Sequence, residues 1–285
     1  MPKVLTQAQI DHFHEQGYLS PVPVLTADEV AYYRGKLEAF EAKHPEHVKK
    51  LKTKSHILFP WVQDLARTKS VLDVYEDLIG PDILCYSMAW RIKNPDGKTF
   101  AGWHQDAAYA PIKPLLVIGA LALGPCGVEQ GCLKVIPGSH KWGVMKHEES
   151  ADPDSILARG QFITDPFDTS KAVDLSLKPG EIGLFNASSI HGSGTNISTD
   201  RRLMLLVEMM PTCVEERTHR DSATLVRGVD KFHTYDEEYR PVEEFGAAEL
   251  AAWHALAQKR AKNVFHNSKL PVSEAYGGAK QPAAS

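Results

Sequence analysis

The sequence is poor in the features that define disulfide-rich, zinc-binding and membrane proteins. Cysteine occurs only four times in 285 residues and never as a Cys-X-X-Cys pair, so neither a redox dithiol nor a zinc knuckle is indicated and we expect buried free thiols. No apolar run approaches the length of a membrane span, and residues 1–11 lack the basic start and apolar middle of a secretory signal. We therefore predict a cytoplasmic protein that has no membrane as a partner.

An excess of charge of one sign is also lacking. The formal net charge is only −4, which argues against nucleic acid or an anionic membrane as the main partner, because such surfaces attract strongly basic proteins. Hydrophobic residues make up 43% of the chain, which is enough to build a full core. We expect a small-molecule substrate and a monomer or homodimer.

The opening part of the chain, about 1–80, has a helical pattern. Thr6 and Thr26 each stand three residues before a Gln or Glu, which is the spacing of a capping box at the start of a helix. We expect the first of these helices to end near Gly17. A third helix is predicted over Val62–Ile79, where apolar residues recur on one side and a Gly-Pro pair follows.

The middle of the chain, about 83–211, consists of short apolar runs separated by turn signals. These runs cover residues 83–92, 115–123, 132–136, 173–177, 181–185 and 202–210. Repeated short strands favour a β-sandwich or barrel over alternating βαβ units. The predicted fold class is therefore mainly β within α+β, a jelly-roll core with helices packed on one sheet.

The remainder, about 212–285, is charged and lacks strand alternation until a helix predicted over 247–262. It is expected to act as a lid, as a dimer arm or as packing against the core, and packing is the commonest role of a terminal helix. We expect residues 1–285 to form a single domain with a helical or looped C-terminal part.

One short motif carries metal chemistry. In His104-Gln105-Asp106 a histidine and a carboxylate stand at positions i and i+2, which on an extended segment project to the same side, while Gln105 points elsewhere. Together with the distant His191 they form the ligand set of a facial-triad iron site, which leaves other coordination positions open. Taken alone, a His-X-Asp tripeptide in a chain with 13 histidines is more often an ordinary hydrogen-bonded pair.

Further residues around this motif make it more specific. Gly102-Trp103 precedes it, Tyr109 follows it, and a later block, Gly131–Lys141, contains the sequence Pro-Gly-Ser-His. With these blocks the sequence resembles the phytanoyl-CoA dioxygenase family of Fe(II)- and 2-oxoglutarate-dependent oxygenases, over roughly Gln9 to Pro211. The resemblance implies a double-stranded β-helix, which is a cupin-like jelly roll and agrees with the strand pattern.

The resemblance also implies a set of ligands. His104 and Asp106 match the first two iron ligands of the family and His191 matches the third, with 2-oxoglutarate and O2 as the implied co-substrates. The family arginine that holds the remote carboxylate of 2-oxoglutarate lies eleven residues after the distal histidine, which is Arg202 here. Alternation alone cannot choose between Arg202 and the adjacent Arg201, because both flanking faces are apolar, and only the family spacing favours Arg202.

Four further side chains are candidates for the same site. Ser193 looks like the family serine that hydrogen-bonds the co-substrate carboxylate, although a turn hydroxyl satisfied by local backbone is equally expected. Gln105 sits where the family often has glutamine. Lys93 and Arg91, on the strand before the motif, either point a charge at the co-substrate or substrate or are solvated, as strand-edge cations usually are.

The activity that the resemblance implies is hydroxylation of an unactivated C–H bond of a small molecule, with release of succinate and CO2. Asp106 disfavours halogenation, because related halogenating enzymes have a small residue at this position. Arg220 and Arg227 offer cations for a small charged or zwitterionic substrate, although surface ion pairs are commoner. Two alternatives stay open: a catalytically silent jelly-roll binding module, and a cupin-like non-oxidative metalloenzyme that uses zinc or manganese.

Overall fold

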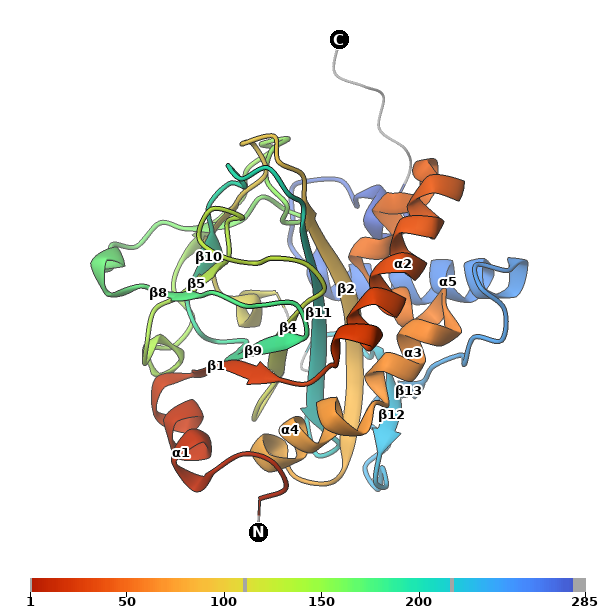
Figure 1. Cartoon of the computed structure of the whole chain (residues 1–285), viewed down its shortest axis with the longest axis horizontal. Coiled ribbons are helices and arrows are strands. Elements are labelled where there is room, and N and C mark those ends of the chain that lie inside the picture. The colour runs from red at the N-terminus through yellow and green to blue at the C-terminus, as the bar shows by residue number, and fades with distance from the viewer. Residues whose placement is uncertain (1, 110–111, 216–217, 279–285) are drawn as a thin grey trace.

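The computed structural model describes residues 2–109, 112–215 and 218–278, and these residues form two main β-sheets (Figure 1). The larger sheet has seven strands in the order β1-β9-β4-β11-β2-β12-β13, and the smaller has four in the order β3-β10-β5-β8. Strands β6 and β7 form a separate pair. Every strand pair is antiparallel except β12 with β13.

The strands of the described residues are β1 (Tyr18–Pro23), β2 (Ile83–Lys93), β3 (Ala101–His104), β4 (Val117–Ala122), β5 (Leu133–Val135), β6 (His147–Glu148), β7 (Phe162–Ile163), β8 (Val173–Leu175), β9 (Glu181–Asn186), β10 (His191–Ser193), β11 (Arg202–Pro211), β12 (Ser222–Arg227) and β13 (Asp236–Glu237). The α-helices are α1 (Gln7–Gln16), α2 (Ala27–Lys43), α3 (Pro60–Ala66), α4 (Lys69–Ile79) and α5 (Ala247–Val264). Short 3-10 turns are η1 (Pro45–Lys52), η2 (Ser55–Ile57), η3 (Asp106–Ala108), η4 (Ser139–Lys141), η5 (Thr169–Lys171) and η6 (Glu274–Tyr276).

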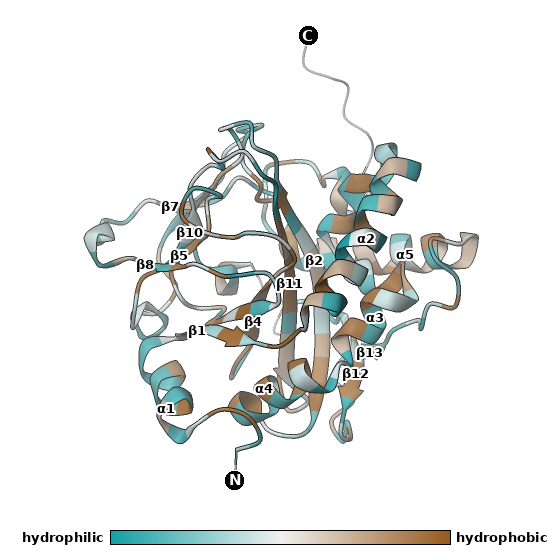
Figure 2. Cartoon of the chain, in the orientation of Figure 1, coloured by the Kyte–Doolittle hydropathy of each residue, from teal (hydrophilic) through white to brown (hydrophobic). Residues whose placement is uncertain are grey.

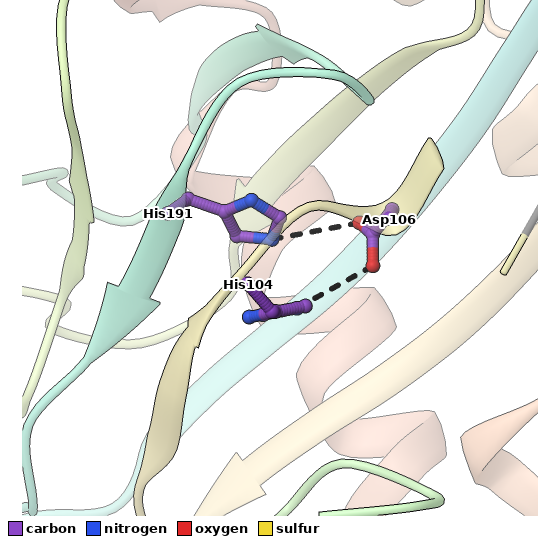
Figure 3. Close-up of side chains that lie close together, drawn as sticks. All are labelled: His104, Asp106 and His191. Atoms are coloured by element: carbon purple, nitrogen blue, oxygen red, sulfur yellow. Dashed lines mark ion pairs between the residues drawn. The ribbon is translucent and has the colours of Figure 1, made fainter. Parts of the chain in front are cut away.

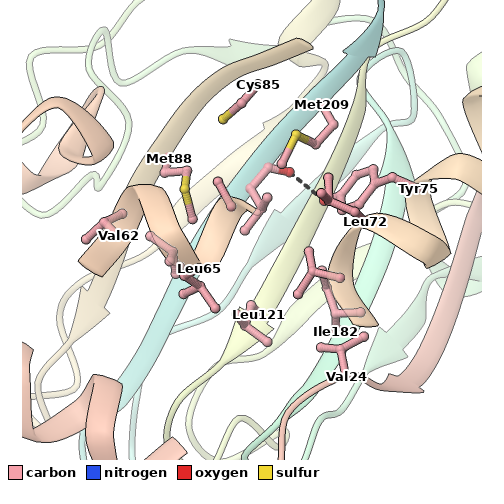
Figure 4. Close-up of a cluster of buried hydrophobic side chains, with 14 of the residues drawn as sticks. Val24, Val62, Leu65, Leu72, Tyr75, Cys85, Met88, Leu121, Ile182 and Met209 are labelled. Atoms are coloured by element: carbon pink, nitrogen blue, oxygen red, sulfur yellow. Dashed lines mark hydrogen bonds between the residues drawn. The ribbon is translucent and has the colours of Figure 1, made fainter. Parts of the chain in front are cut away.

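Two hydrophobic cores lie on opposite faces of the large sheet. One joins the large sheet to the helices and includes Tyr75 of α4 and Trp253 of α5. Figure 4 shows part of it, with the Tyr75 hydroxyl donating to the carbonyl of Val207 on β11 at 2.7 Å. The other core joins the two sheets and includes Ile118 of β4 and Val135 of β5. Figure 2 shows that hydrophobic residues concentrate on the strands of the large sheet. The predicted α+β jelly-roll core, with helices packed on one sheet, is confirmed.

Strand β11 separates these two cores along its whole length. It pairs with β2 on one side and with β4 on the other. The alternate residues Leu203, Leu205, Val207 and Met209 belong to the core on the helix side. The intervening residues Arg202, Met204, Leu206 and Glu208 line a pocket on the side of the small sheet. Because side chains alternate across a strand, this register directs Arg202 into the pocket.

The helix starts follow the sequence closely. The Thr6 and Thr26 side chains accept hydrogen bonds from the backbone N–H groups of Gln9 and Glu29, as a capping box requires. Helix α1 ends at Gly17 in the left-handed conformation, with φ of 77°. These helix starts and this helix end are confirmed.

The single helix predicted over Val62–Ile79 is wrong, because the structure has two helices, α3 and α4, in this region. The break falls at Arg67 and Thr68, and Thr68 has extended backbone with ψ of 128°. The Thr68 hydroxyl donates to the carbonyl of Asp64 at 3.3 Å. Such a local side-chain bond competes with the helical ladder, which the apolar periodicity does not reveal.

Strands also occur where the sequence predicted none. β1 lies in the opening part that was predicted to be helical, and it pairs with β9. β12 lies in the charged tail and pairs with β2. Both are edge or near-edge strands with polar residues, so their hydrophobic pattern is weak. None of the helices in the described part of the chain has the length and apolar character needed to cross a bilayer.

Candidate metal centre

Two histidines face each other across adjacent strands of the small sheet. His104 ends β3 and His191 begins β10, and the antiparallel pairing of these strands sets the two residues directly opposite each other. Their ring centroids are 4.1 Å apart. Gln105 has extended backbone, so Asp106 at the start of η3 returns to the side of His104. The three predicted ligands His104, Asp106 and His191, called the trio below, therefore converge in space (Figure 3).

The geometry of the trio suits a single metal ion. Nε2 of His104 lies 3.4 Å from one carboxylate oxygen of Asp106, and Nε2 of His191 lies 3.5 Å from the other (Figure 3). One potential ligand atom from each residue falls within 4.8 Å of the other two. Two imidazoles and one carboxylate on one side of an ion leave the opposite coordination positions open.

Backbone carbonyls fix the tautomer of both rings. Nδ1 of His104 lies 2.8 Å from the carbonyl of Gly102, and Nδ1 of His191 lies 3.0 Å from the carbonyl of Ser189. A carbonyl oxygen only accepts, so each Nδ1 carries the proton and donates it. Each Nε2 is left with its lone pair directed at the shared centre, which is the arrangement that metal-binding histidines require.

Charge and burial set the protonation states of the trio. Burial, followed by the neighbouring charge of His104, lowers the pKa of His191 to about 4, so its ring is neutral at neutral pH. Burial opposes ionisation of Asp106, but His191, His104 and Arg91 together outweigh it and hold the pKa of this carboxyl below its usual range. A neutral imidazole and an ionised carboxylate are the forms that bind a metal ion.

Three of the other predicted residues, Arg202, Ser193 and Arg91, line the same pocket as the trio. Arg202 is 1% exposed and donates through Nη1 to the carbonyl of Gly131 and through Nη2 to that of Arg91, at 3.4 Å. Among the described residues, the Nε of Arg202 has no hydrogen-bond partner, and no carboxylate forms an ion pair with the Arg202 side chain. Ser193 stands two residues after His191 on β10 and also lines the pocket. A buried guanidinium without an acid and with an unused donor fits the carboxylate of a ligand.

Lys93 lies behind Ser193 rather than at the solvated edge that strand lysines usually occupy. It is fully buried and directly opposite Arg202 in the β2–β11 register. Its Nζ donates to the Ser193 hydroxyl oxygen at 2.7 Å and to the carbonyl of Gly194. Burial, and then the charge of Arg202, lower the pKa of Lys93 to about 6. Lys93 therefore holds the Ser193 hydroxyl in place, and at neutral pH it does so mostly as a neutral amine.

The side chain of Gln105 points away from the trio, and its amide group is already used. Its Nε2 donates to the carbonyls of Gly143 and Ser188 at 2.8 and 2.7 Å, and its Oε1 accepts from the backbone N–H of Met145. With these bonds in place, the side chain is placed to anchor loops around η3. These bonds favour a positioning role for Gln105, and its contact with the co-substrate stays a prediction.

The arginines named from the tail lie elsewhere. Arg220 is more than half exposed and pairs with Asp236 at 2.6 Å, and Arg227 pairs with Asp73 and Glu76 at 2.8 and 2.7 Å. Neither lines the pocket of the trio. Both arginines form ion pairs, which the sequence indicated as the commoner outcome, and the pair of Arg220 is exposed whereas those of Arg227 are partly buried.

The sequence did not single out the residues that form the far wall of the pocket. Glu208 on β11 and Arg260 on α5 form an ion pair at 2.7 Å in which both side chains are buried, and Tyr276 of η6 lies beside them. A lone carboxylate inside the apolar run of β11 is a usable signal for Glu208. Arg260 has no such signal, because its helix has the composition of an exposed one.

These features define a class of protein: a two-sheet jelly roll that carries a two-histidine, one-carboxylate metal site at one end of a pocket and a buried arginine in the same pocket. The chain belongs to the phytanoyl-CoA dioxygenase (PhyH) family, whose model matches residues 13–204. The matched segment contains the trio, Ser193 and Arg202 and ends before Glu208.

Curated relatives resemble part of the chain. A probable alpha-ketoglutarate-dependent hypophosphite dioxygenase of Stutzerimonas stutzeri is 29% identical over 174 residues, which is 59% of this chain and 60% of the relative. The peroxisomal phytanoyl-CoA dioxygenase of Mus musculus is 27% identical over 218 residues, which is 68% of this chain and 64% of the relative. The aligned segments thus span less than two thirds of the length of these relatives.

Solved structures share the fold. The non-heme monooxygenase ThoJ has a TM-score of 0.81 at 24% identity, with 90% of this chain and 98% of that chain covered. The epimerase SnoN, solved with Fe3+, alpha ketoglutarate and nogalamycin RO, has a TM-score of 0.61 at 20% identity, with 74% and 85% covered. At these identities the likeness extends to the fold alone.

Proposed function

We propose that the protein is an Fe(II)- and 2-oxoglutarate-dependent dioxygenase that hydroxylates an unactivated C–H bond of a small molecule and releases succinate and CO2. The observation that carries this proposal is the convergence of His104, Asp106 and His191 in one pocket with Arg202. We further propose that the three parts of the chain, with the C-terminal part closing the pocket, act as one catalytic domain.

The trio is assigned the metal. One carboxylate with two neutral imidazoles suits Fe(II), whereas a structural zinc site is closed by four protein ligands. Bound together, iron and 2-oxoglutarate supply oxygen activation. The residues of the chain hold the ion on one side and leave the side that faces the pocket free.

Arg202 and Ser193 are assigned the remote carboxylate of 2-oxoglutarate. The free Nε donor of Arg202 and its lack of an ion-pair partner among the described residues support this assignment. Lys93 keeps the Ser193 hydroxyl in place. Apolar side chains on or beside both sheets, among them Leu116, Ile118 and Leu133, line the remaining wall, where they exclude water from the reacting centre.

The substrate is proposed to be a small charged metabolite. The pocket of the trio contains three guanidinium groups, those of Arg91, Arg202 and Arg260, against two carboxylates, those of Asp106 and Glu208. The two charges of Fe(II) are balanced by the two carboxylates of 2-oxoglutarate. The loaded pocket therefore keeps one positive charge, which an anionic substrate would balance.

The test is release of succinate and consumption of O2 by the iron-loaded protein with 2-oxoglutarate. We expect activity that Asp106→Ala abolishes, with Asp200→Ala as the matched control, because Asp200 lies outside the pocket. Succinate release by iron-bound Asp106→Ala at the wild-type rate would contradict the assignment. A protein that binds iron and 2-oxoglutarate without turnover would be a silent binding module. If metal analysis of the anaerobically purified protein found only zinc or manganese, this would indicate non-oxidative chemistry.

A further inference from the structure

A second cavity adjoins the pocket of the trio. The two share five lining residues, which are Arg91, Ile156, Leu157, Ala158 and Tyr276. Three of these are apolar, so the connection between the cavities is a largely apolar waist. Arg91 lies at this waist and lines the same pocket as Asp106. A molecule that spans both cavities would therefore pass Arg91.

The second cavity is basic on the side of η1. Lys49 and Lys52 line it together with Arg91, and Nη1 of Arg91 donates to the backbone carbonyl of Lys52 at 2.9 Å. Lys49 pairs with Glu274 at 3.2 Å. The other acid of the lining, Asp152, is exposed and caps the backbone N–H of Asp154.

Lys52 and Arg91 differ from Lys49 because they pair with none of the carboxylates in the described part of the chain. Burial, and then the like charges of Arg91 and Lys49, lower the pKa of Lys52 to about 8. Lys52 and Arg91 are partly buried cations that repel each other, which costs free energy. An anion bound between them would reduce this repulsion.

An unused hydroxyl lies in the same cavity. Ser273 is part of the lining, and its Oγ is buried with no hydrogen-bond partner among the described residues. Ser273 is thus a further donor in the wall that also carries Lys52 and Arg91, and such a set of donors suits an oxyanion.

We propose that Lys52, Arg91 and Ser273 form a binding site for an oxyanion, a carboxylate or phosphoryl group, that the substrate carries at the end remote from the oxidised carbon. The role as a substrate subsite depends on the function proposed above. The apolar waist then holds the middle of the substrate, and the far end lies at the metal centre. The proposed substrates are therefore molecules with an anionic head group and an apolar body, which is a narrower class than the small charged metabolites proposed above.

The test is calorimetric binding to the protein loaded with Fe(II) and 2-oxoglutarate in the absence of oxygen. The probes are octanoate, octyl phosphate and, as the neutral control, octanol. We expect both anions to bind at least about ten-fold more tightly than octanol, since a hydrogen-bonded charge contributes this much or more. Salt should weaken the binding of the anions only. The tighter anion identifies the head group as carboxylate or phosphoryl.

Two variants locate the site. Lys52→Met and Arg91→Gln are each expected to weaken the binding of the anions by about ten-fold and to leave octanol unchanged, while Lys52→Arg retains binding. Lys98→Met is the matched control, because Lys98 is exposed and lines neither cavity. The melting temperature of Lys52→Met should not fall, because the substitution removes a charge with no acid beside it, and this separates lost binding from lost folding.

The proposal is overturned if octanol binds as tightly as the anions, if none of the probes binds, or if both variants bind the anions like the wild type. Binding of 2-oxoglutarate is measured in the same protein. If 2-oxoglutarate does not bind, the proposed dioxygenase function fails; if it binds and the anionic probes do not, only the oxyanion site fails.

Discussion

Arg202 and Arg260 are both buried arginines that line the same pocket, yet their surroundings differ. Arg260 pairs with Glu208 at 2.7 Å and lies over the ring of Tyr86, 4.1 Å from its centroid. Arg202 donates to backbone carbonyls and pairs with none of the acids in the described ranges. Each has unused donors, Nε in both and also Nη1 in Arg260. What separates the two residues is therefore the counter-charge.

This difference also appears in their protonation. Burial lowers the pKa of Arg202 to about 10. Burial acts on Arg260 in the same direction, but Glu208 and the smaller contributions of Tyr86, Tyr276 and Asp221 together outweigh it and raise the pKa of Arg260 above its usual value. A buried cation that the fold itself neutralises is part of the wall, whereas one that the fold leaves without an acid is prepared for an acidic ligand.

The largest effect expected from this comparison is on stability. Glu208→Gln leaves Arg260 buried without its acid and should lower the free energy of unfolding by about 3–5 kcal/mol. Urea unfolding followed by circular dichroism measures this change. The double variant Glu208→Leu with Arg260→Leu should recover most of the loss, and if it is less stable than Glu208→Gln, the ion pair is not what the single variant disturbs.

Arg202→Met should act on the ligand instead. It removes a charged donor and strands no acid among the described residues, so we expect 2-oxoglutarate binding to weaken by about 1.5–3 kcal/mol with little change in stability. Calorimetry on the metal-loaded protein gives the affinity. Arg201→Met is the matched control, because Arg201 pairs with Glu41 at 2.7 Å outside the pocket. Equal losses of affinity in both variants would contradict the role of Arg202.

A smaller effect concerns the proton on Lys93. With a pKa lowered to about 6 by burial and by Arg202, Lys93 is mostly neutral at neutral pH. A dianion bound beside Lys93 raises its pKa, so Lys93 should take up a fraction of a proton when 2-oxoglutarate binds. The affinity for 2-oxoglutarate should therefore fall as the pH rises above about 6. Binding heats in buffers of different ionisation enthalpy measure the uptake. Lys93→Met should abolish it, and unchanged uptake in this variant would assign the proton to another group.

The smallest effect is expected for Arg220, an exposed arginine outside the pocket. Arg220→Gln breaks a solvent-exposed pair with Asp236 and should change the free energy of unfolding by no more than about 1 kcal/mol. Because Arg220 lies outside the pocket, 2-oxoglutarate binding should stay at the wild-type value. A loss of co-substrate affinity would show that the tail arginines reach the site after all.

The sequence predicted the features that depend on neighbouring residues. The capping boxes at Thr6 and Thr26 involve residues three apart, and the convergence of His104 with Asp106 depends only on two extended positions. His191 and Arg202 needed the family resemblance, because their placement depends on strand pairing far along the chain.

Features set by tertiary contacts could not be predicted in the same way. The Glu208–Arg260 pair joins residues 52 positions apart, and the burial of Lys93 follows from its place opposite Arg202 rather than from any local pattern. The alternation of β11, which places Leu203 on the helix side and Arg202 in the pocket, could not be predicted from the apolar residues around Arg201 and Arg202. Periodicity likewise did not reveal the hydroxyl of Thr68 that divides α3 from α4.

The family match stops at residue 204, within β11, while α5 and η6 supply Arg260, Val264 and Tyr276 to the pocket. The residues proposed to hold iron and 2-oxoglutarate thus come first along the chain, and part of the wall of the same pocket comes after them. If the proposed function holds, chimaeras joined near the end of β11 would therefore exchange part of the pocket wall while keeping His104, Asp106, His191 and Arg202.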